Sequence, residues 1–220
     1  RKRLTEFCPN NLLVINNVID FKRFYHASIP TFEERENIIL SVGALKYRKG
    51  QHVSVKAFAP IANKFENVKY YIVGDQSDQS YFGQLKKLVA DLQIEGRVEF
   101  LSSISDEELI GLYKKAKVFV LTSISKSTHF EGFGLVYLEA NACGLPVIGS
   151  VDSGAEDAIV DCKTGFLVQQ NNAEAVASAV TKVFTDKELW KKLSENGTVW
   201  AKEHDWSEII KKYIITYKLK

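Results

Sequence analysis

The stretch of sequence on which the fold depends runs from 129 to 150 and reads HFEGFGLVYLEANACGLPVIGS. Apolar residues recur in it at three- and four-residue steps, which predicts a helix with one buried face: Phe133, Val136, Tyr137 and Ala140. Gly144 and Pro146 predict the end of this helix, because glycine favours a helix C-terminus and proline cannot continue one. The run at 146–150 then predicts a short buried strand.

Glu139 interrupts the apolar pattern of this helix. It lies about two turns into the predicted helix, among Leu138, Ala140 and Ala142. Burying an unpaired carboxylate there would cost several kcal/mol. We therefore expect Glu139 to have a partner.

The start of the predicted helix can bind an anion. Its first backbone N–H groups, from about Gly132 to Leu135, have no acceptor within the helix, and Gly132 and Gly134 let a ligand approach the main chain. Glu131 before the turn and Glu139 after it can accept hydrogen bonds from hydroxyl groups. The set suits a nucleotide-sugar, which has phosphate in its middle and hydroxyl-rich rings on both sides. The simpler interpretation is a capped core helix with one Glu bonded to a neighbouring loop.

Five motifs in a fixed order extend this pattern over nearly the whole chain. Beside Glu131 and Glu139, with Gly-Phe-Gly after the first, they are SVGALKYRKG at 41–50, YYIVGD at 70–75, VEFLSSISDEEL at 98–109 and KTGFLV at 163–168. Together they resemble the donor domain of the retaining glycosyltransferases of family four, which have the GT-B fold. The resemblance implies an α/β fold: a doubly wound, mainly parallel sheet of about six strands with helices on both faces, the Rossmann-like half of a GT-B enzyme.

The resemblance also implies roles for individual residues. Two are catalytic, since Glu131 would hold the transferred sugar and Lys49 would offset the charge of the diphosphate. A larger set would bind the donor: Gly43 near the diphosphate, Ile104 at the wall of the base pocket, Gly132, Phe133, Gly134 and Leu135 at the sugar and phosphate, and Glu139 at the ribose hydroxyls. No residue is an obvious nucleophile, so fixed charge and amide dipoles would assist departure of the leaving group.

The turn after Gly43 departs from the family pattern. Ala44 stands where an arginine is common, and our hypothesis is that Arg48 or Lys46 compensates. The segment continues Arg-Lys-Gly-Gln instead of ending in Gly-Lys-Ser/Thr, which argues against a P-loop. No Gly-x-Gly-x-x-Gly follows a strand, which argues against a dinucleotide-dependent dehydrogenase.

Short apolar runs alternate with helical stretches along the chain. The runs are IILSV, YYIV, VEFL, VFVL and PVIGS, and such runs separated by helices indicate a parallel sheet covered on both faces. Pro60 lies in the helical stretch at about 51–65, where we expect a kink or an early end because proline lacks a backbone donor. Small or polar residues follow the runs at what would be one edge of the sheet, where ligands bind in such folds: Gly43, Gly74, Ser102, Thr122 and Gly149.

Capping residues predict where two of the helices begin. Ser105 and Glu108 form a capping-box pattern, which predicts a helix to about Ala116. Asp78 is expected to cap a helix over about 79–92. One apolar face supports the second helix: Tyr81, Leu85, Leu88 and Leu92.

The composition predicts an ordinary globular chain. Its 220 residues are 45% hydrophobic and 25% charged, enough for a full core and most simply a single domain. The net charge of +2, from 29 basic and 27 acidic residues, argues against nucleic acid as a partner. The cysteines are odd in number and far apart, which argues against a disulfide framework: Cys8, Cys143 and Cys162.

Neither a metal site nor a membrane span is predicted. The histidines share no spacing with carboxylates or cysteines that would suit a metal ion, and no cofactor is expected. No run approaches the roughly 18 to 20 apolar residues of a membrane span. We expect a cytoplasmic protein, which a further domain could hold at the cytoplasmic face of a membrane.

The resemblance divides the chain into an interdomain lead-in at 1–30, a nucleotide-sugar-binding domain at 31–204 and a C-terminal helix at 205–220. It implies that an N-terminal acceptor domain precedes Arg1 and is absent here, and that the last helix crosses back to that domain. We expect the isolated chain to be inactive alone.

The expected function is that of a hexosyltransferase domain. It would bind a UDP- or GDP-hexose and pass the hexose to an unknown hydroxyl acceptor, on a glycan or a lipid-linked molecule. Two alternatives stay open: a non-catalytic nucleotide-sugar-binding module, and a related sugar phosphorylase or nucleotide-sugar epimerase.

Overall fold

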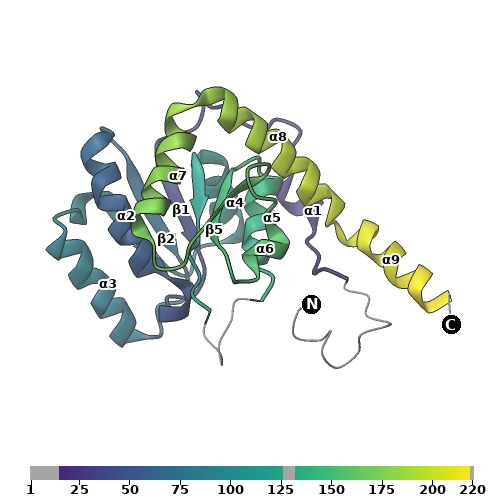
Figure 1. Cartoon of the computed structure of the whole chain (residues 1–220), viewed down its shortest axis with the longest axis horizontal. Helices are drawn as coiled ribbons and strands as arrows, with labels where there is room; N and C mark the ends of the chain where they lie inside the picture. The colour runs from purple at the N-terminus through teal and green to yellow at the C-terminus, as the bar shows by residue number, and fades with distance from the viewer. Residues whose placement is uncertain (1–14, 126–131, 219–220) are drawn as a thin grey trace.

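A six-stranded parallel sheet forms the centre of the computed structural model, which describes residues 15–125 and 132–218 (Figure 1). The strand order is β3-β2-β1-β4-β5-β6, and every neighbouring pair is parallel. The strands are short: β1 Ile38–Val42, β2 Lys69–Val73, β3 Val98–Leu101, β4 Val118–Val120, β5 Val147–Ser150 and β6 Gly165–Val168. The expected parallel sheet is therefore confirmed.

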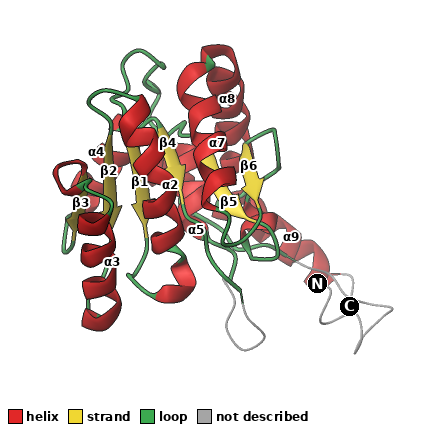
Figure 2. Ribbon diagram, turned by 60° about the vertical axis from the view of Figure 1, so that its left-hand side comes forward, coloured by secondary structure: helices red, strands yellow, loops and turns green. Residues whose placement is uncertain are grey.

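Helices cover both faces of the sheet (Figure 2). In chain order they are α1 Phe21–Phe24, α2 Gln51–Lys64, α3 Gln79–Asp91, α4 Asp106–Lys115, α5 Leu135–Ala142, α6 Ala155–Ala158, α7 Ala173–Thr185, α8 Lys187–Glu203 and α9 Trp206–Lys218. Two short 3-10 turns, Tyr47–Lys49 and Glu95–Arg97, complete the regular structure of the described residues. The doubly wound architecture is the expected one.

The strand order places a switch point between β1 and β4. The chain builds outward from β1 through β2 to β3, then returns to the other side of β1 to add β4, β5 and β6. In open sheets of this kind, ligands bind beyond the carboxyl ends of the strands where the order reverses. The turn after β1 and the loop after β4 therefore flank the expected position of a site.

Two hydrophobic cores lie on opposite faces of the sheet. The α2-side core packs apolar side chains of α2, α3 and α7 against the strands and includes Phe58, Leu85 and Val183. The α5-side core packs α1, α4, α5 and α6 against the other face and includes Tyr113 and Tyr137. Both cores receive residues from α8.

Side-chain caps begin several helices as the sequence predicts. The Ser105 hydroxyl accepts from the Glu108 N–H while the Glu108 carboxylate accepts from the Ser105 N–H, which confirms the capping box. The Asp78 carboxylate accepts from the Tyr81 N–H at the start of α3. These caps satisfy N–H groups that have no partner inside their helices.

Pro60 does not end α2, which continues to Lys64. Proline removes the hydrogen bond to the carbonyl four residues earlier, here that of Lys56. Both Pro60 and Lys56 are exposed, so water can solvate the unpaired carbonyl. Of the two expected outcomes, the early end is wrong for this reason, and the kink stays a prediction.

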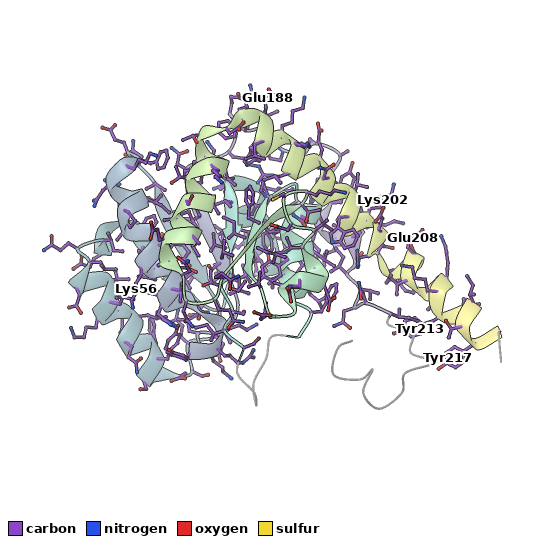
Figure 3. The ribbon with its side chains drawn as sticks, viewed as in Figure 1. Lys56, Glu188, Lys202, Glu208, Tyr213 and Tyr217 are labelled. Atoms are coloured by element: carbon purple, nitrogen blue, oxygen red, sulfur yellow. The ribbon has the colours of Figure 1, made fainter. Side chains whose placement is uncertain are left out.

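The last helix, α9, extends away from the rest of the chain (Figure 1). Figure 3 places Tyr213 and Tyr217 on this extended part, and large apolar side chains along α9 are exposed. At its start, the N–H of Ile19 donates to the His204 carbonyl and the N–H of Trp206 donates to the Ile19 carbonyl, each at 3.1 Å. Within residues 15–125 and 132–218, no helix has the length and apolar character needed to cross a membrane.

Candidate functional site

The main chains at the carboxyl ends of β1 and β2 are in direct contact. The Gly43 N–H donates to the Val73 carbonyl at 2.8 Å, and a Cβ atom placed on Gly74 would lie 2.1 Å from the Gly43 carbonyl oxygen. No side chain fits in this contact, so Gly74 must be glycine. The turn after β1 is thereby fixed against the end of β2.

The end of β4 joins the same edge. The Thr122 hydroxyl donates to the Gly50 carbonyl at 2.8 Å and lies 3.0 Å from the hydroxyl of Ser54 in α2. The residues that follow β1, β2 and β4 are therefore neighbours, as expected. Gly149 differs from the expectation because it lies within β5.

Lys49 lies beside Gly43 in the turn after β1. A Cβ atom on Gly43 would be 3.8 Å from Lys49 Cε, so the lysine side chain passes over the glycine. The Gln51 side chain, almost fully buried, donates from Nε2 to the Ala44 carbonyl at 3.1 Å and holds the turn from below. Lys46 is exposed and Arg48 is half-buried on the same turn, and their compensation for Ala44 stays a hypothesis.

Helix α5 begins at Leu135, about three residues later than its expected start. Gly134 has φ 76° and ψ 59°, a left-handed conformation that precedes the helix and that glycine adopts without strain. The Tyr137 N–H donates to the Gly134 carbonyl at 3.0 Å, whereas helix geometry leaves the N–H groups of Leu135 and Val136 without intrahelical acceptors. The start of α5 can therefore still present amides to an anion.

The other residues of this turn differ in exposure. Gly132 is exposed and Phe133 is buried, with its ring 5.9 Å from that of His204. Glu131 and His129 lie outside the described residues, so the role of Glu131 stays a prediction.

Glu139 has a hydrogen-bond partner, as the sequence predicts. Its carboxylate is half-buried, and Oε2 accepts a hydrogen bond from the Tyr113 hydroxyl at 3.0 Å. Burial raises the pKa of Glu139, while the Tyr113 hydrogen bond and the charge of Arg23 act in the opposite direction. Because α5 starts late, Glu139 lies about one turn into the helix instead of two.

Tyr113 is a site residue that the sequence analysis missed. It is fully buried in α4, and burial, together with the Glu139 charge, raises its pKa well above the ordinary value. One signal was available, because a buried tyrosine hydroxyl usually has a hydrogen-bond partner and Glu139 was known to need one.

Ile104 lies on the same side of the sheet as Glu139. It lies in the loop between β3 and α4, is half-buried and packs against the α5-side core. Two residues later, Asp106 forms an ion pair with Arg23 and is near enough to Glu139 to act on its pKa. The described candidates therefore fall into two groups: the Gly43–Lys49 turn, and Ile104, Phe133 and Glu139 on the α5 side of the sheet.

A large apolar cavity lies elsewhere in the described part of the chain. About 600 Å³ in volume, it separates the segment Ile29–Glu33 from α8 and is lined by Phe32, Trp190 and Val199 among others. The segment precedes β1, so this cavity is near the amino ends of the strands. Within the described ranges, no group of three or more His, Cys, Asp or Glu side chains is arranged to hold a metal ion.

The family model of the glycosyl transferases group 1 matches residues 24–200 of the chain. The chain belongs to this family. A GDP-mannose-dependent α-(1-6)-phosphatidylinositol monomannoside mannosyltransferase of Mycolicibacterium smegmatis is 30% identical over 166 residues, which are 74% of this chain and 43% of that protein. The chain spans about half the length of the curated relatives it matches.

Solved structures of glycosyltransferases share the fold. A glycosyltransferase from Rickettsia africae is 25% identical with a TM-score of 0.85, and the match covers 99% of this chain and 60% of that one. Anabaena HepE, solved in complex with UDP and glucose, is 24% identical with a TM-score of 0.79 over 94% of this chain and 56% of that one. The glycosyl transferases group 1 chain thus has the Rossmann-like fold of one half of a GT-B enzyme, as the motifs implied.

Proposed function

We propose that this chain is the donor-binding domain of a retaining glycosyltransferase, which transfers a hexose from a nucleoside diphosphate to a hydroxyl acceptor. The observation that carries the proposal is the half-buried Glu139 carboxylate, which accepts a hydrogen bond from Tyr113 one turn into α5, the helix that follows the carboxyl end of β4. A carboxylate has about four acceptor positions, more than the Tyr113 bond uses. It is suited to accept hydrogen bonds from the two hydroxyls of a ribose.

The opposite part of the edge suits a diphosphate. The Lys49 side chain passes over Gly43, and the first amides of α5 point out of the helix toward the same edge. Positive charge and fixed N–H dipoles stabilise the negative charge that develops on a departing nucleoside diphosphate. In this proposal Lys49 and the amides of Phe133, Gly134 and Leu135 supply that stabilisation.

The proposal assigns the remaining candidates by their place along the donor. Ile104 would border the nucleobase, Gly43 and Gly132 would let the main chain approach the ligand, and Glu131 would hold the hexose. The relatives support a UDP- or GDP-hexose as donor, since one is named for GDP-mannose and HepE was solved with UDP-glucose. Transfer itself would also require a part that binds the acceptor.

Calorimetric titration with UDP, GDP and ADP, and with their hexose conjugates, tests the proposal. We expect one preferred nucleotide, and Glu139→Ala should weaken it by about ten- to a hundredfold, roughly 1.5–3 kcal/mol, because charged hydrogen bonds are lost. Glu188→Ala is the matched control, because Glu188 is an exposed glutamate in the first turn of α8 and belongs to no candidate site (Figure 3).

Two outcomes would change the conclusion. If no nucleotide binds at millimolar concentration to this chain or to the full-length protein, the donor-domain proposal is wrong. Binding without turnover by the full-length protein would make the chain a binding module, an outcome that Ala44 makes worth testing because the usual arginine is missing. Product analysis separates hexose transfer from phosphorolysis and epimerisation.

A further inference from the structure

Arg35 is a buried cation whose hydrogen-bond partners are neutral carbonyls. Only 3% of it is exposed. Its Nη1 atom donates to the carbonyls of Tyr113 and Ala116, each at 2.8 Å, and Nη2 donates to the Cys143 carbonyl at 2.6 Å. Burial lowers the pKa of Arg35 to about 10. Burying a guanidinium is unfavourable unless its surroundings compensate, so these three bonds need an explanation.

The three carbonyls belong to the C-terminal ends of two helices. Ala116 is the C-cap residue of α4 and Cys143 is the C-cap residue of α5. Carbonyls at such ends lack intrahelical donors and carry the negative end of the helix dipole. The planar Arg35 fork therefore joins the ends of α4 and α5, and the Trp190 ring lies 5.1 Å from the guanidinium carbon.

These same two helices carry the Tyr113–Glu139 pair. Arg35 binds the main-chain carbonyl of Tyr113, while the Tyr113 hydroxyl binds the Glu139 carboxylate. On α5, the Cys143 N–H donates to the Glu139 carbonyl at 3.2 Å, so the Arg35 contact is one helical turn beyond Glu139. Two bridges thus connect α4 to α5, one through the guanidinium and one through the tyrosine.

We propose that Arg35 is a positioning residue of the nucleotide site, which sets the Tyr113–Glu139 geometry by holding the ends of α4 and α5 together. The inference rests on the proposed function for what Glu139 binds. Lysine cannot replace the arginine, because its compact ammonium lacks the planar fork that reaches carbonyls of two helices at once. If Arg35 served stability alone, its effect on nucleotide affinity would not depend on the Tyr113 hydroxyl.

A double-mutant cycle in UDP and GDP binding tests this coupling. Arg35→Lys should weaken the preferred nucleotide about tenfold in the wild-type background, and less than threefold in the Tyr113→Phe background, where the bond that Arg35 positions is already gone. Equal losses in both backgrounds, or no loss in either, would overturn the proposal. If Arg35→Lys does not fold, Arg35→Gln takes its place in the cycle, since its neutral amide can still donate to one helix end.

Arg97 provides a matched control on the other side of the sheet. It is half-buried, and its Nη1 atom donates to the carbonyls of Ala62 and Phe65 at the C-terminal end of α2, at 2.6 and 3.1 Å. Arg97→Lys should lower the melting temperature without changing nucleotide affinity. A loss of affinity as large as that of Arg35→Lys would mean that any lost arginine cap weakens binding, and would refute the specific role.

Melting temperatures of the same variants separate the inference from the proposed function. If no nucleotide binds the wild-type chain or the full-length protein, the proposed function fails, and the coupling is judged without ligand. Non-additive changes in melting temperature for Arg35→Lys and Tyr113→Phe support a clamp that acts through Tyr113. Additive changes overturn it.

Discussion

The two faces of the sheet differ in the polar groups that they bury. In the α2-side core, buried polar contacts join hydroxyls, such as the 2.7 Å hydrogen bond between Ser41 Oγ and the Tyr70 hydroxyl. On the α5 side, the helices enclose the Arg35 guanidinium and part of the Glu139 carboxylate. Charged groups lose far more solvation than hydroxyls when they are buried, so Arg35 and Glu139 are costly to bury on the α5 side. On the α2 side Lys117 is also buried, with its ammonium 4.1 Å from the centre of the Phe32 ring.

Most described residues of the candidate site lie on the face that buries Arg35 and Glu139. Ile104, Phe133 and Glu139 all lie on the α5 side, and the Gly43–Lys49 turn lies where the chain passes from β1 to α2. The α2 side then serves mainly to stabilise the sheet. If this division is correct, substitutions on the two faces should separate loss of stability from loss of nucleotide affinity.

Phe58→Ala should have the largest effect. Phe58 is 1% exposed in the α2-side core, and removing a buried phenyl group costs about 3–5 kcal/mol of unfolding free energy. Denaturant titration should show this loss, while calorimetry on the folded variant shows unchanged nucleotide affinity. Val199→Ala, at a 60% exposed position, is the control and should stay within about 0.5 kcal/mol. Lower affinity in folded Phe58→Ala would contradict the division between the faces.

Gly134→Ala should affect both stability and binding. A Cβ atom would enter a left-handed backbone and lie 2.7 Å from the Tyr137 ring, which cannot move freely because its hydroxyl donates to the Leu121 carbonyl at 2.6 Å. We expect a loss of about 1–3 kcal/mol in unfolding free energy and weaker nucleotide binding from the displaced amides.

Gly111→Ala is the matched control for that substitution. Gly111 lies inside α4 with open space where its Cβ would be, and replacing glycine by alanine in a helix interior gains roughly 0.5–1 kcal/mol. If both glycine variants are equally stable and bind equally well, the strained turn before α5 is not needed for binding.

Tyr113→Phe should lower nucleotide affinity by a smaller amount. The variant keeps the ring but removes the hydrogen bond that orients Glu139, which contributes about 1 kcal/mol, or roughly fivefold in affinity. Tyr70→Phe removes a buried tyrosine hydroxyl from the α2 side and should reduce stability without affecting binding. Calorimetry measures the nucleotide affinity of both variants and thermal melts measure their stability. Equal affinity losses in the two variants would contradict the division of roles between the two faces.

The pH dependence of binding should give the smallest effect. Burial raises the Glu139 pKa above 4.5, so the carboxylate protonates, and becomes a poorer acceptor, at a higher pH than an ordinary glutamate. Nucleotide affinity should therefore fall as pH falls toward and through this raised pKa. The effect on stability has the opposite direction. Because the folded state binds the Glu139 proton more tightly than the unfolded state does, the contribution of Glu139 to the unfolding free energy rises as pH falls through the same range.

Glu139→Gln isolates this titration from that of the nucleotide phosphates. The difference between wild type and Glu139→Gln should shrink as pH is lowered through the raised pKa of Glu139. A difference that stays constant from neutral to acid pH would mean that the charge of Glu139 does not contribute to binding.

Features set by neighbouring residues could be predicted from the sequence. The capping box at Ser105, the Asp78 cap and the alternation of apolar runs with helices depend on contacts within a few residues, and the structure confirms them. The start of α5 was expected about three residues too early, and α2 does not have the early end at Pro60 that was one of the two expected outcomes. In each case the result depends on local backbone geometry or solvent exposure, which hydrophobic periodicity does not encode.

Contacts between distant residues could be predicted only in part. The sequence showed that Glu139 needs a partner, but Tyr113 is 26 residues away on another helix, and only the packing of α4 on α5 brings it near. Arg35 would be placed on the surface by its charge alone. Its burial follows from the meeting of two helix ends, which no short pattern in the sequence describes.

The pairing of Ile19 with the His204–Trp206 segment has a practical consequence for protein engineering. The segment around Ile19 and the start of α9, whose Ile209 is still buried, lie side by side, and main-chain hydrogen bonds of 3.1 Å from and to Ile19 hold them together. Units whose entry and exit are adjacent tolerate insertion and circular permutation. The block can therefore be exchanged between relatives as a cassette with both splice junctions at one place on its surface.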